Sequence, residues 1–497
     1  MIKRNISKFG ASSTALLAIL GLTACDAVQQ RLASSQSDEV STDAVSARPS
    51  KDPYPSTYER YPSDVTAIVN ATIYDGVGGY IENGVLVFAD GVIAALGSAE
   101  TTTPPDGAVV IDAAGKFVTP GVIDIHSHLG NYPSPGTAST SDGNEATAAN
   151  TAGVWTEHSV WPQDAGFTRA LAGGVTTLQI LPGSANLFGG RSVILKNVPS
   201  RTVQGMKFPG APYGLKMACG ENPKRVYGDK GGPGTRMGNF RGYRQGWIAA
   251  TAYKKKWDKY DADFKKWKDG GGSAKDEPSA PDRDLKLETL AGALDGEVVV
   301  NMHCYRADEM VQVLDLAKEF GYKLQTFHHA VEAFKIADYL AENEVCAALW
   351  ADWWGFKLEA YDSVRENVAM VHAQPGGCAI VHSDSDVGIQ RLNQEAGKAL
   401  ADGNLAGLNI SKADAMAWIT SNPARAMGID DQTGSLEAGK MADVVIWSAD
   451  PFSVYAQAER VYVDGALLYD RTDPMRSPRM DFEIGQDGND IFGGAGQ

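Results

Sequence analysis

The spacing of hydrophobic and polar positions is similar near the two ends of the chain and different in the middle. Between about residues 65 and 115, short β-rich runs such as 67–74 and 84–88 alternate with glycine-rich turns, which predicts strands. The same texture returns at 444–447 and 461–463 near the other end. Strands at both ends around a different middle predict one small β domain that both ends build together.

The middle, about residues 121–425, alternates between two periodicities. Helical spacing is found, for example, at 307–320. Apolar runs typical of buried strands stand at 176–181, 298–302, 323–327 and 345–349. Alternating β and α units over this length predict an α/β fold, with a parallel sheet closed into a (β/α)8 TIM-type barrel. In that fold the residues that follow the strands meet at one mouth, where the chemistry takes place.

These patterns also predict where the domains begin and end. From the N-terminus, we expect a signal peptide at 1–25, a flexible tether at 26–60, part of a β-sandwich at 61–120, the barrel at 121–425, the rest of the sandwich at 426–475 and a tail at 476–497. A helical insert at about 250–285 carries aromatic residues on one face, namely Tyr253, Trp257, Tyr260, Phe264 and Trp267. We expect this face to pack on the barrel rather than to form a lid or a dimer contact.

The N-terminal segment has the features of a bacterial export signal. A basic start precedes an apolar stretch at 15–22 that is too short to span a membrane. The residues Leu-Thr-Ala-Cys that end at Cys25 resemble a lipobox, which implies a lipid on Cys25, and Asp26 suggests retention at the inner membrane. We therefore predict a lipoprotein on the periplasmic side of the bacterial cell envelope, held to the membrane only by its lipid. An ordinary secretory signal cleaved near Ala24 is the alternative.

Charge and cysteine usage narrow the choice of partners. A formal net charge of -16, from 45 basic and 61 acidic residues, argues against nucleic acid or an anionic membrane surface. We expect a small-molecule substrate, and a homo-oligomer stays open. The other cysteines, Cys219, Cys304, Cys346 and Cys378, stand singly and without a Cys-x-x-Cys motif. They predict small apolar core residues rather than a disulfide scaffold, although an oxidising compartment leaves a bridge open.

Histidines and an aspartate stand where the predicted strands end. His126 and His128 close one apolar run, and alternate residues of a strand face the same side. His303, His329 and Asp384 also follow apolar runs. Together these side chains offer the nitrogen and oxygen donors that zinc or a related transition metal accepts. The sequence therefore predicts a metal site at the barrel mouth, and a water activated by the metal makes a hydrolase the leading hypothesis.

Several motifs resemble the amidohydrolase superfamily, in its imidazolonepropionase-like branch. They occur in consistent order between about residues 65 and 470, at 120–128, which ends in His-Ser-His, at 381–384, at 421–424 and at 434–443. The resemblance implies a metal-containing (β/α)8 barrel with a flanking β-sandwich. It further implies that His126 and His128 are ligands from the first strand, that His303 is the ligand from the fifth, and that Asp384 is the ligand and proton carrier from the eighth.

Two of the implied ligand positions stay open. On the sixth strand we prefer His329 over His328, because adjacent strand residues face opposite sides. On the fourth strand the candidates are Lys216, whose long arm would carry a carbamate between two ions, and Glu221, whose shorter carboxylate would bind directly. We expect zinc, as one or two ions, with iron or manganese as alternatives.

The implied reaction is hydrolysis of a non-peptide C–N bond, in a cyclic amide or a related group, by metal-activated water. Asp384 would carry the proton to the leaving nitrogen, and His329 would bind metal or stabilise an oxyanion. Candidates for substrate binding are Tyr305, Arg306 and Arg191, the last as partner of a substrate carboxylate. A dipeptidase or prolidase-like peptidase is the alternative enzyme, and a non-catalytic binding lipoprotein on the same fold is the alternative outside the enzyme class.

Overall fold

The computed structural model describes residues 45–134, 136–272 and 274–477. The signal peptide with Cys25 and Asp26, the tether before residue 45 and the tail from residue 478 lie outside the described residues, so what was predicted for them stays a prediction. In the part of the chain that is described, no helix combines the length and the apolar character needed to cross a membrane. The described residues fall into two compact units, one made of 45–48 and 256–281 and the other of 49–255 and 282–477.

The smaller unit contains the second half of helix α4 (Arg236–Asp269) and the residues before 49. The backbone N–H of Ala47 donates to the hydroxyl of Tyr260 at 3.0 Å. The guanidinium of Arg48 lies 6.0 Å from the centre of the Trp257 ring. Residues 45–48 thus contact part of the aromatic face that we expected to pack on the barrel.

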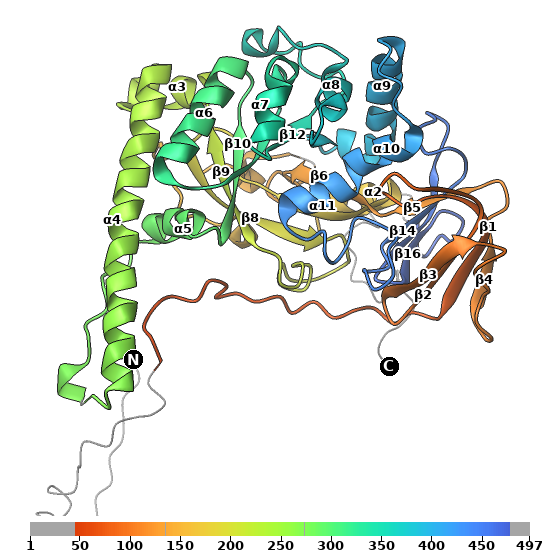
Figure 1. Cartoon of the computed structure of the whole chain (residues 1–497), viewed down its shortest axis with the longest axis horizontal. Coiled ribbons are helices and arrows are strands. Elements are labelled where there is room, and N and C mark those ends of the chain that lie inside the picture. The colour runs from red at the N-terminus through yellow and green to blue at the C-terminus, as the bar shows by residue number, and fades with distance from the viewer. Residues whose placement is uncertain (1–44, 135, 273, 478–497) are drawn as a thin grey trace, which may run out of the picture. The chain divides into compact units, whose positions relative to one another are not determined.

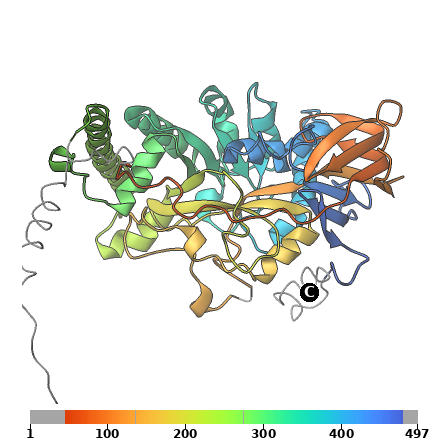
Figure 2. The same ribbon diagram turned by 90° about the horizontal axis from the view of Figure 1, so that it is seen from below.

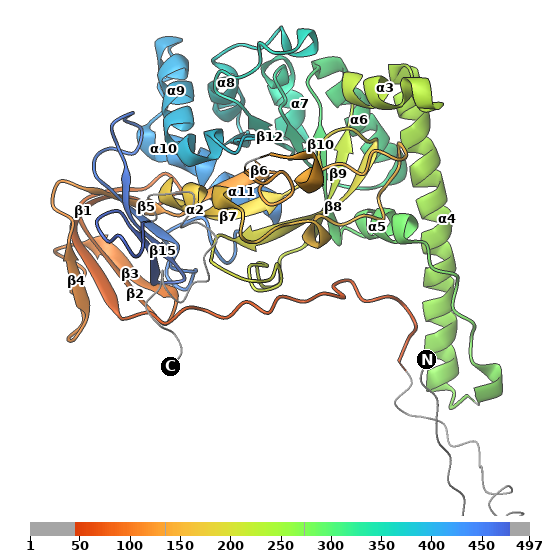
Figure 3. The same cartoon turned by 180° about the vertical axis from the view of Figure 1, so that it is seen from behind.

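One sheet of eight strands joins the two ends of the larger unit, as the sequence predicted (Figures 1 and 3). Its strands are β1 (Thr66–Tyr74), β2 (Tyr80–Ala89), β3 (Val92–Ser98), β4 (Val109–Asp112), β5 (Phe117–Pro120), β14 (Val444–Trp447), β15 (Ala458–Val463) and β16 (Ala466–Asp470). They are ordered β16-β15-β14-β5-β1-β2-β3, with β4 beside β1. The ends meet where β14 pairs with β5 in antiparallel fashion. The strands form one hydrogen-bonded sheet instead of the two sheets expected of a sandwich.

A second sheet of eight strands forms a nearly closed barrel. In sheet order its strands are β13 (Ala379–Val381), β12 (Cys346–Leu349), β11 (Leu324–His328), β10 (Val298–His303), β9 (Tyr213–Ala218), β8 (Phe188–Lys196), β7 (Val175–Ile180) and β6 (Val122–Ser127). Strand β8 runs antiparallel to both of its neighbours, which corrects the all-parallel barrel that we predicted. The connection 181–187 is too short for the crossover that a parallel strand needs, so the chain turns back instead.

Helices line the outside of this sheet and follow most of its parallel strands (Figures 1 and 2). Besides α4 they are α2 (Ala165–Ala172), α3 (Glu221–Tyr227), α5 (Leu285–Leu294), α6 (Ala307–Phe320), α7 (Ala337–Glu342), α8 (Asn367–Ala373), α9 (Leu392–Leu405), α10 (Lys412–Met416) and α11 (Ser421–Met427). In α6, Met310, Val313 and Ala317 recur at helical spacing and are buried. Gly321 ends this helix in the left-handed conformation, with φ 75°.

The two edge strands of the barrel, β6 and β13, are joined by loop and side-chain hydrogen bonds. The backbone N–H of Asp384 donates to the carbonyl of His126 at 3.0 Å. The backbone N–H of Ser383 donates to Asp124 Oδ1 at 3.2 Å, and the Ser383 hydroxyl bonds the same carboxylate. Asp124 is completely buried, so these bonds close the barrel where a backbone ladder is missing. They also make the end of β6 and the residues after β13 direct neighbours.

Two disulfides correct the expectation of unpaired core cysteines. Cys219 is bonded to Cys304, and Cys346 is bonded to Cys378. The cause is strand register. Strands β9 and β10 contain a pair of residues that face each other, and each cysteine of the first disulfide directly follows one member of that pair. Strands β12 and β13 contain a similar pair, and each cysteine of the second disulfide directly precedes one of its members. Spacing along the sequence does not reveal such cross-strand neighbours.

Candidate metal centre

The ends of β6 and β13 bring two histidines and a carboxylate together. The Nε2 atom of His128 lies 3.2 Å from Oδ1 of Asp384, and the Nε2 atom of His126 lies 3.6 Å from the same oxygen. One donor atom from each residue lies within 4.8 Å of the other two. These three residues are grouped closely enough that they could hold one metal ion. These residues are three of the ligands that the sequence analysis proposed.

His329 approaches the same carboxylate from β11. Its Nε2 lies 3.7 Å from Asp384 Oδ2, and its ring stacks on Trp350 with centroids 4.4 Å apart. His329 and Asp384 both have left-handed backbones, with φ of 58° and 50°. Such conformations are uncommon outside glycine and concentrate at functional sites. His329 directly follows β11 in this conformation, so the simple alternation of faces does not continue through His329.

His328 lies beneath the centre and makes a chain of hydrogen bonds. Its Nε2 lies 2.9 Å from Asn301 Oδ1, and its Nδ1 lies 2.8 Å from Nδ1 of His126. The Asn301 amide is oriented by its donor bond to the carbonyl of Val299, so Oδ1 is the acceptor and His328 Nε2 carries the proton. Burial, reinforced by the charge of Lys216, holds the pKa values of His126 and His328 well below the ordinary value, so both rings are neutral.

The direction of the proton chain follows from that neutrality. With its one proton on Nε2, His328 accepts at Nδ1 and His126 must donate from Nδ1. His126 therefore presents an unprotonated Nε2 to the centre, where Nζ of Lys216 lies 3.2 Å from it. His128 is fixed in the same way, because its Nδ1 lies 2.8 Å from the carbonyl of Leu181 and must donate to it. Hydrogen bonds of this kind orient metal-binding histidines in general.

Lys216, from β9, lies among these histidines. Its side chain is buried, and Nζ lies 3.2 Å from Nε2 of His126. Burial lowers the pKa of Lys216 to about 7. The amine is therefore substantially neutral at physiological pH, and the neutral form is the one that can react with carbon dioxide to form a carbamate. Glu221, the other fourth-strand candidate, begins α3 with its Oε1 3.7 Å from Nζ of Lys357.

His303 stands at the end of β10, beside His329, with the two ring centroids 4.9 Å apart. Its Nε2 lies 3.3 Å from the side-chain nitrogen of Asn222. Burial, with the charges of Lys216 and Lys357, holds the pKa of His303 well below its ordinary value. The ring is therefore neutral, which is the form that binds a metal.

Unpaired ring nitrogens gather at this centre. Among the described residues, the buried imidazole nitrogens without a hydrogen-bond partner are Nδ1 of His303, Nδ1 of His329 and both nitrogens of His382. Buried polar atoms are normally paired, so orphaned imidazole nitrogens call for an explanation. Nitrogen donors that face a bound ion provide one, and the donor set fits a divalent transition metal.

The pKa values of His382 and Asp384 are both lowered, but for different physical reasons. The His382 ring lies 4.7 Å from that of His329, and burial lowers its pKa to about 3. Burial alone would raise the pKa of Asp384, but the close contact with His128 and the charges of neighbouring basic side chains lower it below the usual value. Asp384 is thus ionised at neutral pH and able to accept a proton. His382 was not among the residues predicted from the sequence, although it stands inside the motif at 381–384.

The structure places only one of the three predicted substrate-binding residues at the centre. Tyr305 lies at the centre, with its ring 4.6 Å from that of His303. Arg306 pairs with Asp308 at 2.9 Å on the surface. Arg191, which we expected to face a substrate carboxylate, is buried in β8, where its guanidinium carbon lies 4.2 Å from the centre of the Trp155 ring. These contacts give Arg191 a packing role within strand β8.

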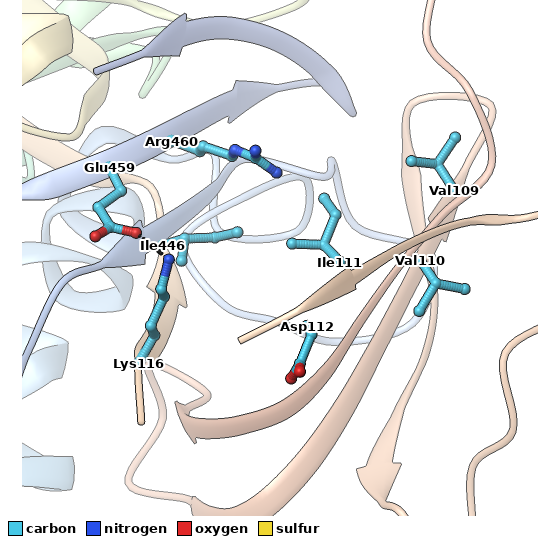
Figure 4. A pocket seen from close by; sticks show the side chains of 8 residues that line it. All are labelled: Val109, Val110, Ile111, Asp112, Lys116, Ile446, Glu459 and Arg460. Carbon is cyan, nitrogen blue, oxygen red and sulfur yellow. Dashed lines mark hydrogen bonds and ion pairs between the residues drawn. The ribbon is translucent and has the colours of Figure 1, made fainter. Parts of the chain in front are cut away.

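A pocket of about 330 Å³ lies elsewhere, in the β domain (Figure 4). Its lining residues come from β4, β14, β15 and the turn before β5, and they are Val109, Val110, Ile111, Asp112, Lys116, Ile446, Glu459 and Arg460. Lys116 and Glu459 form an ion pair at 2.5 Å. None of the candidate metal ligands lines this pocket, so it is separate from the centre.

Comparisons with known proteins agree with one another. A family model described as "Amidohydrolase family" matches residues 394–469. The amidohydrolase tasK of Hapsidospora irregularis is 32% identical over 385 residues, which are 74% of this chain and only 38% of tasK. An imidazolonepropionase of Mesorhizobium japonicum is 25% identical over 405 residues, 76% of this chain and 90% of the relative. A solved amidohydrolase structure from Thermotoga maritima is 32% identical, with a TM-score of 0.73, over 82% of this chain and 100% of that chain.

Proposed function

This chain belongs to the amidohydrolase superfamily, which confirms the resemblance drawn from its motifs, and from that premise we propose that it is a metal-dependent hydrolase of a non-peptide C–N bond. The substrate group is a cyclic amide or a related group. The observation that carries this proposal is the convergence of His126, His128 and Asp384 on one point. Their donor atoms lie at the ends of the two edge strands of the barrel, and packing alone does not explain why they converge.

We propose that these three residues hold an ion together with His329 and His303. Lys216 as a carbamate would hold a second ion, and its buried, substantially neutral amine beside His126 supports that role. Glu221 is less suited, because its carboxylate faces Lys357. Zinc fits the nitrogen-rich donor set best, and iron or manganese accept the same donors.

In the proposed mechanism a proton passes from the attacking water to the leaving nitrogen of the scissile bond. A bound divalent ion supplies an acidified water and polarises the substrate carbonyl. Asp384 accepts the proton of the attacking water and delivers it to the nitrogen as the C–N bond breaks. His329 is held beside Asp384 by its stack on Trp350, which orients its ring for binding the ion.

The place of action that we propose is the periplasmic side of the bacterial cell envelope. The proposal rests on the export signal and the lipobox-like Cys25. Two disulfides support it, because disulfides persist in oxidising compartments. The partner is a small molecule, and the lipid provides the membrane attachment.

Metal analysis followed by a substrate panel tests the proposed function. The purified protein is assayed with hydantoins, imidazolones, N-acyl amides and dipeptides. We expect one or two divalent ions per chain and turnover of a cyclic amide. Turnover of dipeptides alone would make the protein a peptidase instead. Bound metal without turnover of any member would make it a binding protein.

A further inference from the structure

A lysine beside the candidate centre makes its hydrogen bonds to neutral oxygens and has one long ion pair to an acid. Lys357 lies in the loop after β12, and its side chain is 21% exposed. Its Nζ donates to Asn222 Oδ1 at 2.9 Å and lies 3.4 Å from the Tyr305 hydroxyl. Both partners are neutral oxygens. Among the described residues, the carboxylate that pairs with Lys357 is Glu221 at 3.7 Å, which is longer than a normal hydrogen bond.

A second acid close in sequence is bound elsewhere. Glu359 forms an ion pair with Arg236 and accepts the backbone N–H of Glu221 at 3.0 Å. Its direct contacts are therefore with Arg236 and with the start of α3. A half-buried ammonium that donates mainly to neutral groups keeps most of its attraction for an anion.

The partners of Lys357 connect it directly to the centre. The side-chain nitrogen of Asn222 lies 3.3 Å from Nε2 of His303, and its oxygen accepts from Lys357. The ring of Tyr305 lies 4.6 Å from that of His303. The ammonium and the phenol hydroxyl thus lie on the His303 side of the centre, within reach of one small molecule.

We propose that Lys357 and Tyr305 form a carboxylate-binding subsite, so that the substrate is an amide that also bears a carboxylate. This inference rests on the proposed function, whose substrate class it specifies. A carboxylate has two oxygens that accept several hydrogen bonds, while Lys357 has three N–H donors and Tyr305 has one O–H donor. Lys357 takes the role that the sequence analysis gave to Arg191, whose guanidinium is held by Trp155 and Thr289.

Binding of matched probes tests the subsite without relying on catalysis. The probes are the monoamides from malonamate to adipamate, each compared with the corresponding neutral diamide by isothermal titration calorimetry. We expect the wild-type protein to bind at least one acid about tenfold or more tightly than its diamide. Lys357→Met should abolish this preference, a loss of about 10- to 100-fold for the acid, because a hydrogen bond to a charged group is removed. Affinity for the diamides should stay within about twofold.

Two further variants separate charge from structure. Lys357→Gln keeps an N–H donor but not the charge, and it should also lose most of the preference for the acid. Lys323→Met removes a lysine whose side chain is 60% exposed, and it should bind every probe as the wild type does. The subsite is refuted if no acid binds the wild type more tightly than its diamide, or if both Lys357 variants keep the preference.

Measurements with and without metal separate this inference from the proposed function. The titrations are made on chelator-treated protein and again after zinc is restored, and hydrolysis is followed only in the second case. A Lys357-dependent preference for acids, together with no turnover of any hydantoin, imidazolone or amide by the zinc-restored protein, would refute the proposed function and leave the subsite standing. Equal kcat/KM for acids and diamides in both the wild type and Lys357→Met would refute the subsite and leave the proposed function standing.

Discussion

Replacing His328 by leucine should weaken metal binding even though His328 is not a proposed ligand. His328 accepts a hydrogen bond from the Nδ1–H of His126, with 2.8 Å between the two nitrogens. The hydrogen bond from His328 to Asn301 fixes this direction. Leucine fills similar space but accepts no hydrogen bond. The Nδ1–H of the fully buried His126 would be left without a partner, or the proton would move to Nε2 and block the lone pair that faces the centre.

Two estimates of the size of this effect agree. A buried donor left unpaired costs about 1–3 kcal/mol, which corresponds to about 5- to 150-fold in an equilibrium constant. Loss of a hydrogen bond that orients a metal-binding histidine lowers metal affinity by about 10- to 100-fold. We therefore expect His328→Leu to reduce zinc affinity by about one to two powers of ten.

Competition titration of zinc against a chelator measures the effect, with thermal unfolding of the metal-free protein as a check on the fold. His328→Asn is the matched control, because its side-chain oxygen can take the position of Nδ1 and accept from His126. This variant should keep zinc affinity within about fivefold of wild type. Equal loss in both variants, or wild-type affinity in His328→Leu, would refute the proton chain.

Three other predictions concern the proton carrier, the buried lysine and a disulfide. Asp384→Asn should keep most of the bound metal but lower kcat by about 10²- to 10⁴-fold, measured by elemental analysis and steady-state kinetics, and near-normal rates would remove Asp384 from the mechanism. Because the pKa of Lys216 is about 7, reactivation of metal-free protein by zinc and bicarbonate should speed up as pH rises through 7 and the amine loses its proton; a rate independent of pH would argue against the carbamate. Replacing Cys346 and Cys378 by alanine opens a loop of 32 residues and should lower the free energy of unfolding by about 4 kcal/mol in urea titrations, whereas an unchanged midpoint would contradict this.

The sequence was informative wherever local pattern and topology agree. His126 and His128 end a buried strand that the hydrophobic run reveals, and parallel strands carry their final residues to the same mouth. The same logic brought His303 and Asp384 to one region of the barrel. The β domain could be predicted from both ends because its strands have the usual turns and β-rich runs.

What the sequence did not reveal depends on register and on loops. Gly189 and Gly190 stand just before Arg191, and because such glycine pairs are typical of loops, the sequence did not reveal that Arg191 belongs to the buried strand β8. The disulfides depend on which residues face each other across β9 and β10 or β12 and β13. Lys357 reaches the centre through the path of a loop, and no spacing rule predicts such a path.

The most direct test of the account is the location of the metal itself. Anomalous diffraction at the zinc edge, from crystals of the protein grown with zinc, should give a peak in contact with Nε2 of His126, Nε2 of His128 and a carboxylate oxygen of Asp384. Extra density on Nζ of Lys216 beside a second peak would support the carbamate. Zinc bound elsewhere, or fully occupied crystals with no peak among these three side chains, would contradict the central claim.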